Sequence, residues 1–206
     1  MFFESNGKIL LSSEYLVLDG AKSIALPSKL TQELIVSKAN DDSILWESFD
    51  YNQNLWFQEK FKIKDGELIY EGKENMISEK LLSLFNHIHK FKDISNTLGN
   101  KFVTKLNFKR DWGLGSSSTF VNNLAKWADI DPYKLLFSSF KGSGYDIACC
   151  NSNYPITYSN LDNSISVKKI AISPVFRENI YLIYLGRKQN TQNSIESYYK
   201  KSFDKQ

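Results

Sequence analysis

The sequence reads Asp-Trp-Gly-Leu-Gly-Ser-Ser-Ser-Thr at residues 111–119, between an expected strand and an expected helix. Gly113 and Gly115 lie one residue apart, so the backbone there can approach a ligand with no Cβ in the way. A helix that begins at the serines directs unpaired N–H groups and the positive end of its dipole at that ligand. The pattern predicts an anion-binding loop, although a glycine turn with a serine N-cap fits it equally well. It lacks the lysine-serine ending of the common P-loop.

Hydrophobic patterning around this loop predicts a mostly β first part followed by helices. Apolar runs and alternation predict strands at residues 8–11, 15–18, 24–27, 34–37, 44–49, 56–63, 68–70 and 102–108. Apolar residues at three- and four-residue spacing predict helices at residues 76–91, 120–128 and 133–140. The dipeptide Asp65-Gly66 is typical of a hairpin turn. A buried strand at residues 181–185 and a polar helix at residues 194–201 are expected near the end, so the fold class is α+β.

Composition excludes disordered and fibrous proteins, since 42% of the 206 residues are hydrophobic and 24% are charged. The formal net charge of +3 is too small to predict a nucleic-acid-binding surface, but it is compatible with an anionic ligand. No run reaches the roughly 20 apolar residues that a membrane helix needs. The adjacent Cys149 and Cys150 are expected to be a reduced pair. We therefore expect a cytoplasmic protein with neither nucleic-acid nor membrane partners, and its oligomeric state stays open.

Two further segments offer groups that could act on a ligand. In Lys-Gly-Ser-Gly-Tyr-Asp-Ile-Ala at residues 141–148, Asp146 could serve as a general base for a hydroxyl, or simply cap a turn or helix. Near the start, Lys8 beside Gly7 could stabilise charge on a transferred phosphoryl group, or be a solvated edge-strand lysine. Glu14 could equally be a surface carboxylate. Each segment alone predicts little.

Together, and in this order, the three segments resemble the GHMP kinase superfamily of small-molecule kinases. That family opens with Gly-Lys and then Gly-Glu-His or Gly-Glu-Tyr, seen here at residues 7–8 and, with serine for glycine, at residues 13–15. Its Gly-Leu-Gly-Ser-Ser signature is intact at residues 113–117, and its Ser-Gly-x-Asp element is present at residues 143–146. Residues 144–148 spell GYDIA. The chain thus resembles the branch named after that string, close to mevalonate and phosphomevalonate kinases.

The resemblance implies a fold in two parts and an activity. Residues 1–172 are expected to form an ATP-binding N-terminal domain, an antiparallel sheet with helices on one face like the second domain of ribosomal protein S5. Residues 173–206 are expected to begin an incomplete, C-terminally truncated, ferredoxin-like domain. The implied activity is transfer of the γ-phosphoryl group of ATP to mevalonate, phosphomevalonate or a similar small hydroxy acid. The alternatives are a catalytically impaired nucleotide- or partner-binding fragment and an enzyme that decarboxylates diphosphomevalonate.

The resemblance also implies a role for each matching residue. The ATP phosphates would be bound by Gly113, Leu114, Gly115, Ser116, Ser117 and Ser118. The hydroxyl of Ser117 would contact Mg²⁺, Asp146 would orient or deprotonate the substrate hydroxyl, and Lys8 would stabilise the γ-phosphoryl group. The substrate site would be lined by Glu14, Ser143 and Gly144. Leu135 stands where mevalonate kinases carry a magnesium-binding glutamate.

Overall fold

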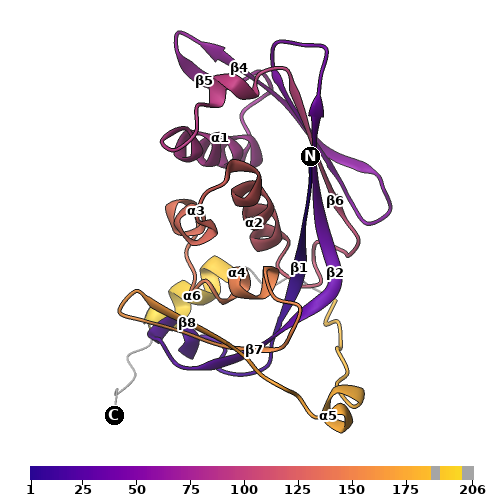
Figure 1. Cartoon of the computed structure of the whole chain (residues 1–206), viewed down its shortest axis with the longest axis vertical. Helices are drawn as coiled ribbons and strands as arrows, with labels where there is room; N and C mark the ends of the chain where they lie inside the picture. Colours follow the sequence, from indigo (N-terminus) through magenta and orange to yellow (C-terminus); the bar gives the residue numbers. More distant parts are fainter. Residues whose placement is uncertain (187–190, 201–206) are drawn as a thin grey trace.

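The computed structural model of this chain describes residues 1–186 and 191–200, and in it helices pack on one face of an eight-stranded sheet (Figure 1). The strands are β1 (Phe2–Leu10), β2 (Ser23–Lys38), β3 (Ile44–Phe49), β4 (Leu55–Lys64), β5 (Glu67–Tyr70), β6 (Asn100–Leu106), β7 (Ile156–Leu161) and β8 (Ser164–Lys169). The helices are α1 (Met76–His89), α2 (Ser116–Ala128), α3 (Pro132–Ser139), α4 (Tyr145–Cys150), α5 (Pro174–Glu178) and α6 (Thr191–Lys200). This arrangement confirms the predicted α+β class.

The sheet is arranged around β2, which is 16 residues long. β1 pairs with one side of β2 in antiparallel fashion, whereas β6 and then β7 pair with the other side. The strand order is β5-β4-β3-β6-β2-β7-β8, and only the β3–β6 pair is parallel among the described strands. The strands predicted separately at residues 24–27 and 34–37 are therefore two parts of β2.

The main hydrophobic core lies between the sheet and α1, α2 and α3. At its centre the Trp46 ring of β3 stacks on Phe102 of β6, with ring centroids 5.4 Å apart. Phe85 of α1 and Phe120 of α2 meet the same indole edge to face, at 6.0 Å and 5.5 Å. Such aromatic contacts are directional, so they fix how the helices sit on the sheet.

Two expected strands are wrong. Residues 15–18 do not extend: a 3₁₀ helix, η1 (Leu16–Asp19), begins after Tyr15, whose φ is +62°. The N–H of Val17 donates to the carbonyl of Ser13 and that of Leu18 donates to Tyr15, so local bonds satisfy groups that a strand would offer to a neighbour. Residues 181–185 have no regular structure and are exposed, because no described strand pairs with them.

The polar helix predicted at residues 194–201 corresponds to α6, which packs on the η1 segment. The ring of Tyr198 stacks on Tyr15 with centroids 5.5 Å apart. Its hydroxyl donates to Asp19 at 2.6 Å. The helix is thereby anchored to the segment that carries Glu14.

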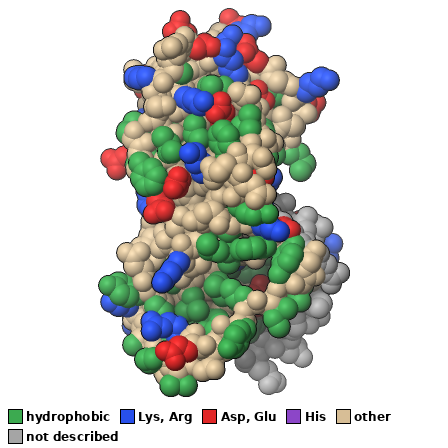
Figure 2. Space-filling view, turned by 90° about the vertical axis from the view of Figure 1, so that its right-hand side faces the viewer, with side chains coloured by type: hydrophobic (Ala, Val, Ile, Leu, Met, Phe, Trp, Pro, Cys, Tyr) green, Lys and Arg blue, Asp and Glu red, His purple; other side chains and the backbone are tan. Residues whose placement is uncertain are grey.

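Charged and hydrophobic side chains are unevenly distributed over the face seen in Figure 2. Figure 2 shows lysines and acidic side chains gathered at the end that carries β4 and β5, and hydrophobic side chains gathered over the lower half. That half includes α5, where Val175 and Phe176 are exposed. Within the described residues, no helix combines the length and the apolar character needed to cross a membrane.

Candidate active site

The glycine-rich loop leads directly into α2, whose N-terminus has no side-chain cap. Gly113 and Gly115 have φ values of +75° and +83°, a region that favours glycine. The first turn closes when the N–H of Thr119 donates to the carbonyl of Gly115 at 3.0 Å. Within the described part of the chain, the backbone N–H groups of residues 116–118 have no hydrogen-bond acceptor. Together with the helix dipole, they form a cradle suited to an anion.

Leu114 attaches this loop to the rest of the fold. Its side chain is buried against Leu106 and Phe108, so only its backbone is available to a ligand. Its carbonyl accepts a hydrogen bond from the N–H of Lys8 at 2.9 Å. A Cβ on Gly7 would lie 3.0 Å from that carbonyl oxygen, which is closer than ordinary contact. Glycine at position 7 thus allows β1 to lie directly against the loop.

The side chain of Lys8 joins the loop to Asp146. Its stem passes Gly115, where an added Cβ would lie 3.0 Å from Lys8 Cγ. Its Nζ donates to the hydroxyl of Tyr145 at 2.6 Å and lies 3.2 Å from Asp146 Oδ1. Three segments far apart in the sequence therefore meet at one lysine. Figure 1 shows the elements that carry them, β1, α2 and α4, in adjacent positions.

The charges of this cluster support one another. Burial alone would favour the neutral amine of Lys8, but Asp146 and Tyr145 outweigh it and hold the pKa of Lys8 above its ordinary value. Burial, reinforced by the Asp146 carboxylate, raises the pKa of Tyr145. At neutral pH the cluster therefore holds a lysine cation and an uncharged phenol beside the Asp146 carboxylate.

Ser143 and Gly144 set the direction of α4. Gly144 has a φ of +91° and is the N-cap residue, and an added Cβ would lie 2.9 Å from the hydroxyl oxygen of Tyr158. That hydroxyl donates to the carbonyl of Ser143 at 2.5 Å. Ser143 is buried, with its Oγ 3.5 Å from the N–H of Tyr145. Both predicted substrate-site residues lie next to Asp146, and their contacts hold the turn that places Asp146 in the first turn of α4.

Other predicted residues lie at the margin of this cluster. Ser117 is exposed at the start of α2. Glu14 is exposed and forms neither a hydrogen bond nor an ion pair with Lys8 or Asp146, although its charge contributes to the raised pKa of Tyr145. Leu135 is fully buried in the core. The sequence interpretation missed Tyr145, for which adjacency to Asp146 was the only signal.

In residues 1–186 and 191–200, no group of three or more His, Cys, Asp or Glu side chains is arranged to hold a metal. Mg²⁺ commonly binds through one or two protein oxygens and the phosphates of a substrate. The hydroxyl of Ser117 and the carboxylate of Asp146 are oxygen donors of the kind that Mg²⁺ prefers.

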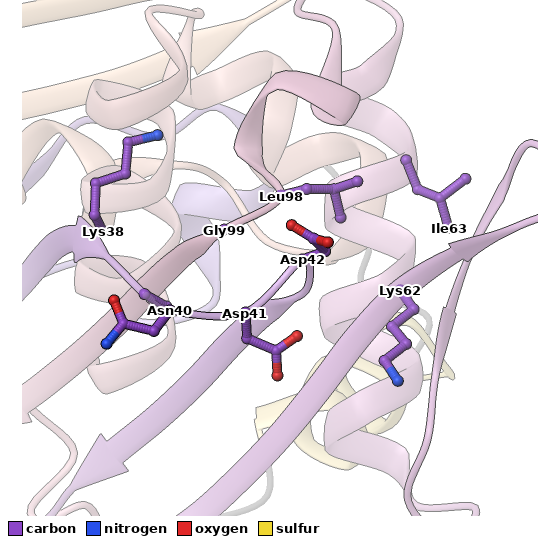
Figure 3. A pocket seen from close by; sticks show the side chains of 9 residues that line it. Lys38, Asn40, Asp41, Asp42, Lys62, Ile63, Leu98 and Gly99 are labelled. Carbon is purple, nitrogen blue, oxygen red and sulfur yellow. The ribbon is translucent and has the colours of Figure 1, made fainter.

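A hollow lined by charged side chains lies away from this cluster. It is lined by Lys38, Ala39, Asn40, Asp41, Asp42, Lys62, Ile63, Leu98 and Gly99 (Figure 3). Lys38 lies eight residues along β2 from Leu30, which touches the glycine-rich loop region, a separation of roughly 25 Å. Asp41 is paired with Lys60, and Lys62 is paired with Glu71 at 2.7 Å. Two of the four charged residues that line the hollow therefore already have partners.

The chain has the fold of the GHMP kinase superfamily of small-molecule kinases and related enzymes. A mevalonate kinase structure matches with a TM-score of 0.61 at 14% identity, over 98% of this chain and 67% of that one. The D-glycero-D-manno-heptose 1-phosphate kinase of Bacteroides thetaiotaomicron matches with a TM-score of 0.61 at 14% identity, over 85% of this chain and 61% of that one.

A third similar structure is the Streptococcus pneumoniae phosphomevalonate kinase, solved in complex with phosphomevalonate and AMPPNP. It matches with a TM-score of 0.57 at 13% identity, over 82% of this chain. The match covers 58% of that chain, so this chain spans well under two thirds of its length. No protein-family profile and no curated protein matches the sequence.

Proposed function

We propose that this chain is an ATP-dependent small-molecule kinase that phosphorylates a small anionic hydroxy acid such as mevalonate or phosphomevalonate. The observation that carries the proposal is the position of Lys8. Its backbone bonds to the glycine-rich loop, its stem lies along Gly115 and its ammonium group lies 3.2 Å from Asp146. An anion cradle, a fixed cation and a carboxylate are the groups that phosphoryl transfer requires.

The loop would hold the nucleotide. The backbone amides of residues 113–118 would surround the ATP phosphates, which fits the left-handed glycines and the uncapped start of α2. The hydroxyl of Ser117 would be a ligand of Mg²⁺. When bound, Mg²⁺ would neutralise part of the charge on the phosphates.

Asp146 and Lys8 would act on the substrate. The carboxylate of Asp146 would orient the substrate hydroxyl and accept its proton as the oxygen bonds to the γ-phosphorus. The bond between that phosphorus and the bridging oxygen would break, which leaves ADP. Lys8 would keep Asp146 in place and stabilise the negative charge of the γ-phosphoryl group, while Tyr145 holds the ammonium group from the other side.

The finer assignments belong to the same proposal. Residues 1–172 would be a domain like the second domain of ribosomal protein S5, and residues 173–206 would begin a ferredoxin-like domain. The sheet with helices on one face supports the first assignment, since its last strand, β8, ends at Lys169. Glu14, Ser143 and Gly144 would lie on the substrate side of Asp146, and the protein would act in the cytoplasm.

Calorimetric titration with Mg-ATP tests the nucleotide site. The Gly115→Val variant should lose nucleotide binding, because its Cβ would lie 3.0 Å from Lys8 Cγ and its φ of +83° disfavours valine. The Asp146→Asn variant should bind Mg-ATP within about twofold of the native chain but turn over about 10²- to 10⁴-fold more slowly. Equal binding by both variants would count against the phosphate cradle.

Mass analysis of the products distinguishes the alternatives. Incubation with Mg-ATP and either mevalonate or phosphomevalonate should give an acid that has gained a phosphate, whereas diphosphomevalonate should be left unchanged. Loss of carbon dioxide from diphosphomevalonate would assign the chain to decarboxylation instead. Retained Mg-ATP binding with no product from any of these acids would indicate a nucleotide-binding fragment.

A further inference from the structure

The middle of α2 contains a buried asparagine whose hydrogen-bonding groups are all paired. Asn122 is 0% exposed, and asparagine is a poor helix former, so packing alone does not explain its presence. Its Nδ2 donates to Ser5 Oγ at 2.7 Å and to Asn151 Oδ1 at 3.0 Å. Its Oδ1 accepts from Asn151 Nδ2 at 2.8 Å. Both donors and the acceptor of this amide are therefore satisfied.

The partners of Asn122 belong to the other two elements that carry the candidate active site. Ser5 lies on β1, three residues before Lys8. Asn151 is the C-cap residue of α4, five residues after Asp146. Asn122 itself lies on the helix whose first turn is the anion cradle. One side chain thus connects the elements that carry the lysine, the carboxylate and the cradle.

Apolar packing alone does not determine the register of these elements. Five of the six residues of α4 are buried, but hydrophobic contact is non-directional and tolerates small rotations and slides. The reciprocal amide pair between Asn122 and Asn151 is satisfied in one orientation only. A buried polar network that is fully paired fixes a unique arrangement, because any shift leaves a desolvated group without a partner.

We propose that Asn122 is a positioning residue, which holds β1, α2 and α4 in the register at which Lys8 reaches both the glycine-rich loop and Asp146. The expected effect on turnover rests on the proposed kinase activity, whereas the register itself is a property of the fold. Loss of the amide pair would let α4 shift and would weaken the contact between Lys8 and Asp146. The anion cradle, formed by α2 itself, would remain.

The neighbouring Asn123 provides a matched control. It is 1% exposed on the same helix, accepts from Ser5 Oγ at 2.6 Å and donates to the carbonyl of Gln32 at 2.7 Å. Neither of these hydrogen bonds reaches α4. Replacement of Asn123 by alanine removes two buried hydrogen bonds, against three for Asn122, without releasing α4, so it reports the effect of destabilisation.

Competitive acetylation of Lys8, followed by mass spectrometry of the folded chain, tests the register without any assay of activity. The ammonium group of Lys8 is protected by its pairing with Asp146 and Tyr145. Asn122→Ala should raise the acetylation rate of Lys8 at least about threefold above that of Asn123→Ala. If Asn122→Ala does not fold, Asn151→Ala serves instead, because Asn151 is exposed and its loss leaves the bond between Asn122 and Ser5 in place. Equal rates in the Asn151 and Asn123 variants would overturn the proposal.

Steady-state kinetics provides the second test. Asn151→Ala should lower kcat about tenfold and leave KM for Mg-ATP within about twofold, since a displaced catalytic group affects the chemical step more than binding. Asn151→Asp, which keeps the acceptor for Asn122 Nδ2, should recover part of that loss. Equal kcat values in Asn151→Ala and Asn123→Ala would overturn the proposal. If the native chain has no turnover, the proposed function fails, and the acetylation rates alone decide the positioning role.

Discussion

Substitution of Gly7 by alanine tests whether the loop and β1 are in contact as closely as the structure indicates. The new Cβ would lie 2.8 Å from Ser28 Oγ, 3.0 Å from the Leu114 carbonyl oxygen and 3.2 Å from that of Leu30. Optimal carbon contacts begin at about 3.5 Å, so the loop carbonyl must retreat by roughly 0.5 Å. Ser28 Oγ cannot turn away freely, because it donates to the Leu30 carbonyl at 2.7 Å.

The cost of this substitution has two parts. Overpacking in a close contact costs about 1–3 kcal/mol. Weakening of the bond from the Lys8 N–H to the Leu114 carbonyl, now 2.9 Å, adds about 0.5–1.5 kcal/mol. Gly7→Ala should therefore lower the free energy of unfolding by about 2–4 kcal/mol and weaken Mg-ATP binding, because the loop moves away from β1.

Urea unfolding and calorimetric titration with Mg-ATP measure both effects. Gly66→Ala, in the turn between β4 and β5, is the control: its Cβ would meet nothing within 4 Å, but its φ of +83° should cost about 1–2 kcal/mol. Unfolding of Gly7→Ala within about 0.5 kcal/mol of the native chain, with unchanged nucleotide binding, would refute the reasoning.

Three further substitutions test strain, burial and packing. Ser13 has a φ of +62°, and its hydroxyl donates to the Lys22 carbonyl at 2.8 Å. Glycine and alanine both remove this hydrogen bond, but only glycine adopts the positive φ without strain, so Ser13→Gly should be about 1 kcal/mol more stable than Ser13→Ala in urea unfolding. Equal stability of the two variants would show that the backbone at residue 13 is not strained. Burial raises the pKa of the Cys149 thiol from 9.0 to about 12, so the folded state keeps a proton that the unfolded state loses. The contribution of this thiol to stability is complete below pH 9.0 and falls as the pH rises towards about 12. Over that pH interval, the free energy of unfolding in urea should fall less steeply in Cys149→Ala than in the native chain, and equal slopes would contradict the prediction. Trp46→Ala should lower the free energy of unfolding by about 3–5 kcal/mol, and a loss below about 1 kcal/mol would show that the core is not centred on this ring.

Elements defined by local patterns were predicted well. The hairpin at Asp65-Gly66 joins β4 to β5, and both residues have the positive φ that such a turn needs. The apolar spacing predicted α1, although that helix ends at His89 and not at residue 91. These features depend on neighbouring residues only, so the sequence contains the information that determines them.

Elements that depend on distant partners were predicted poorly. An apolar run such as residues 181–185 indicates a strand whether or not another strand lies beside it, and here none of the described strands does. The six residues of α4 are too few for helical periodicity to be visible, and a left-handed Gly144 begins them. From the sequence alone, Asn122 would be placed on a solvated helix face, because the sequence does not indicate that a polar side chain is buried.

The candidate site shows the same division. The sequence motifs predicted Lys8, Gly115 and Asp146 as site residues, and the structure brings these three residues together. Their contacts are long-range, so no local pattern could indicate that the Lys8 N–H bonds to Leu114 or that Gly7 makes room for the loop. The roles implied for Glu14, Ser143 and Ser117 stay predictions until the variants and ligands described above are measured.

The length of β2 has a consequence for how the protein unfolds. This strand is bonded to β1, which precedes it, and to β6 and β7, which are formed much later in the chain. Because both halves of the sheet are hydrogen-bonded to β2, neither half can unfold without breaking bonds to this strand. The unfolding transition should therefore be cooperative, and the pairing of segments far apart in the sequence should slow folding. The amide of Leu34, which is buried in the part of that strand paired with both β1 and β6, should exchange with deuterium only through global opening.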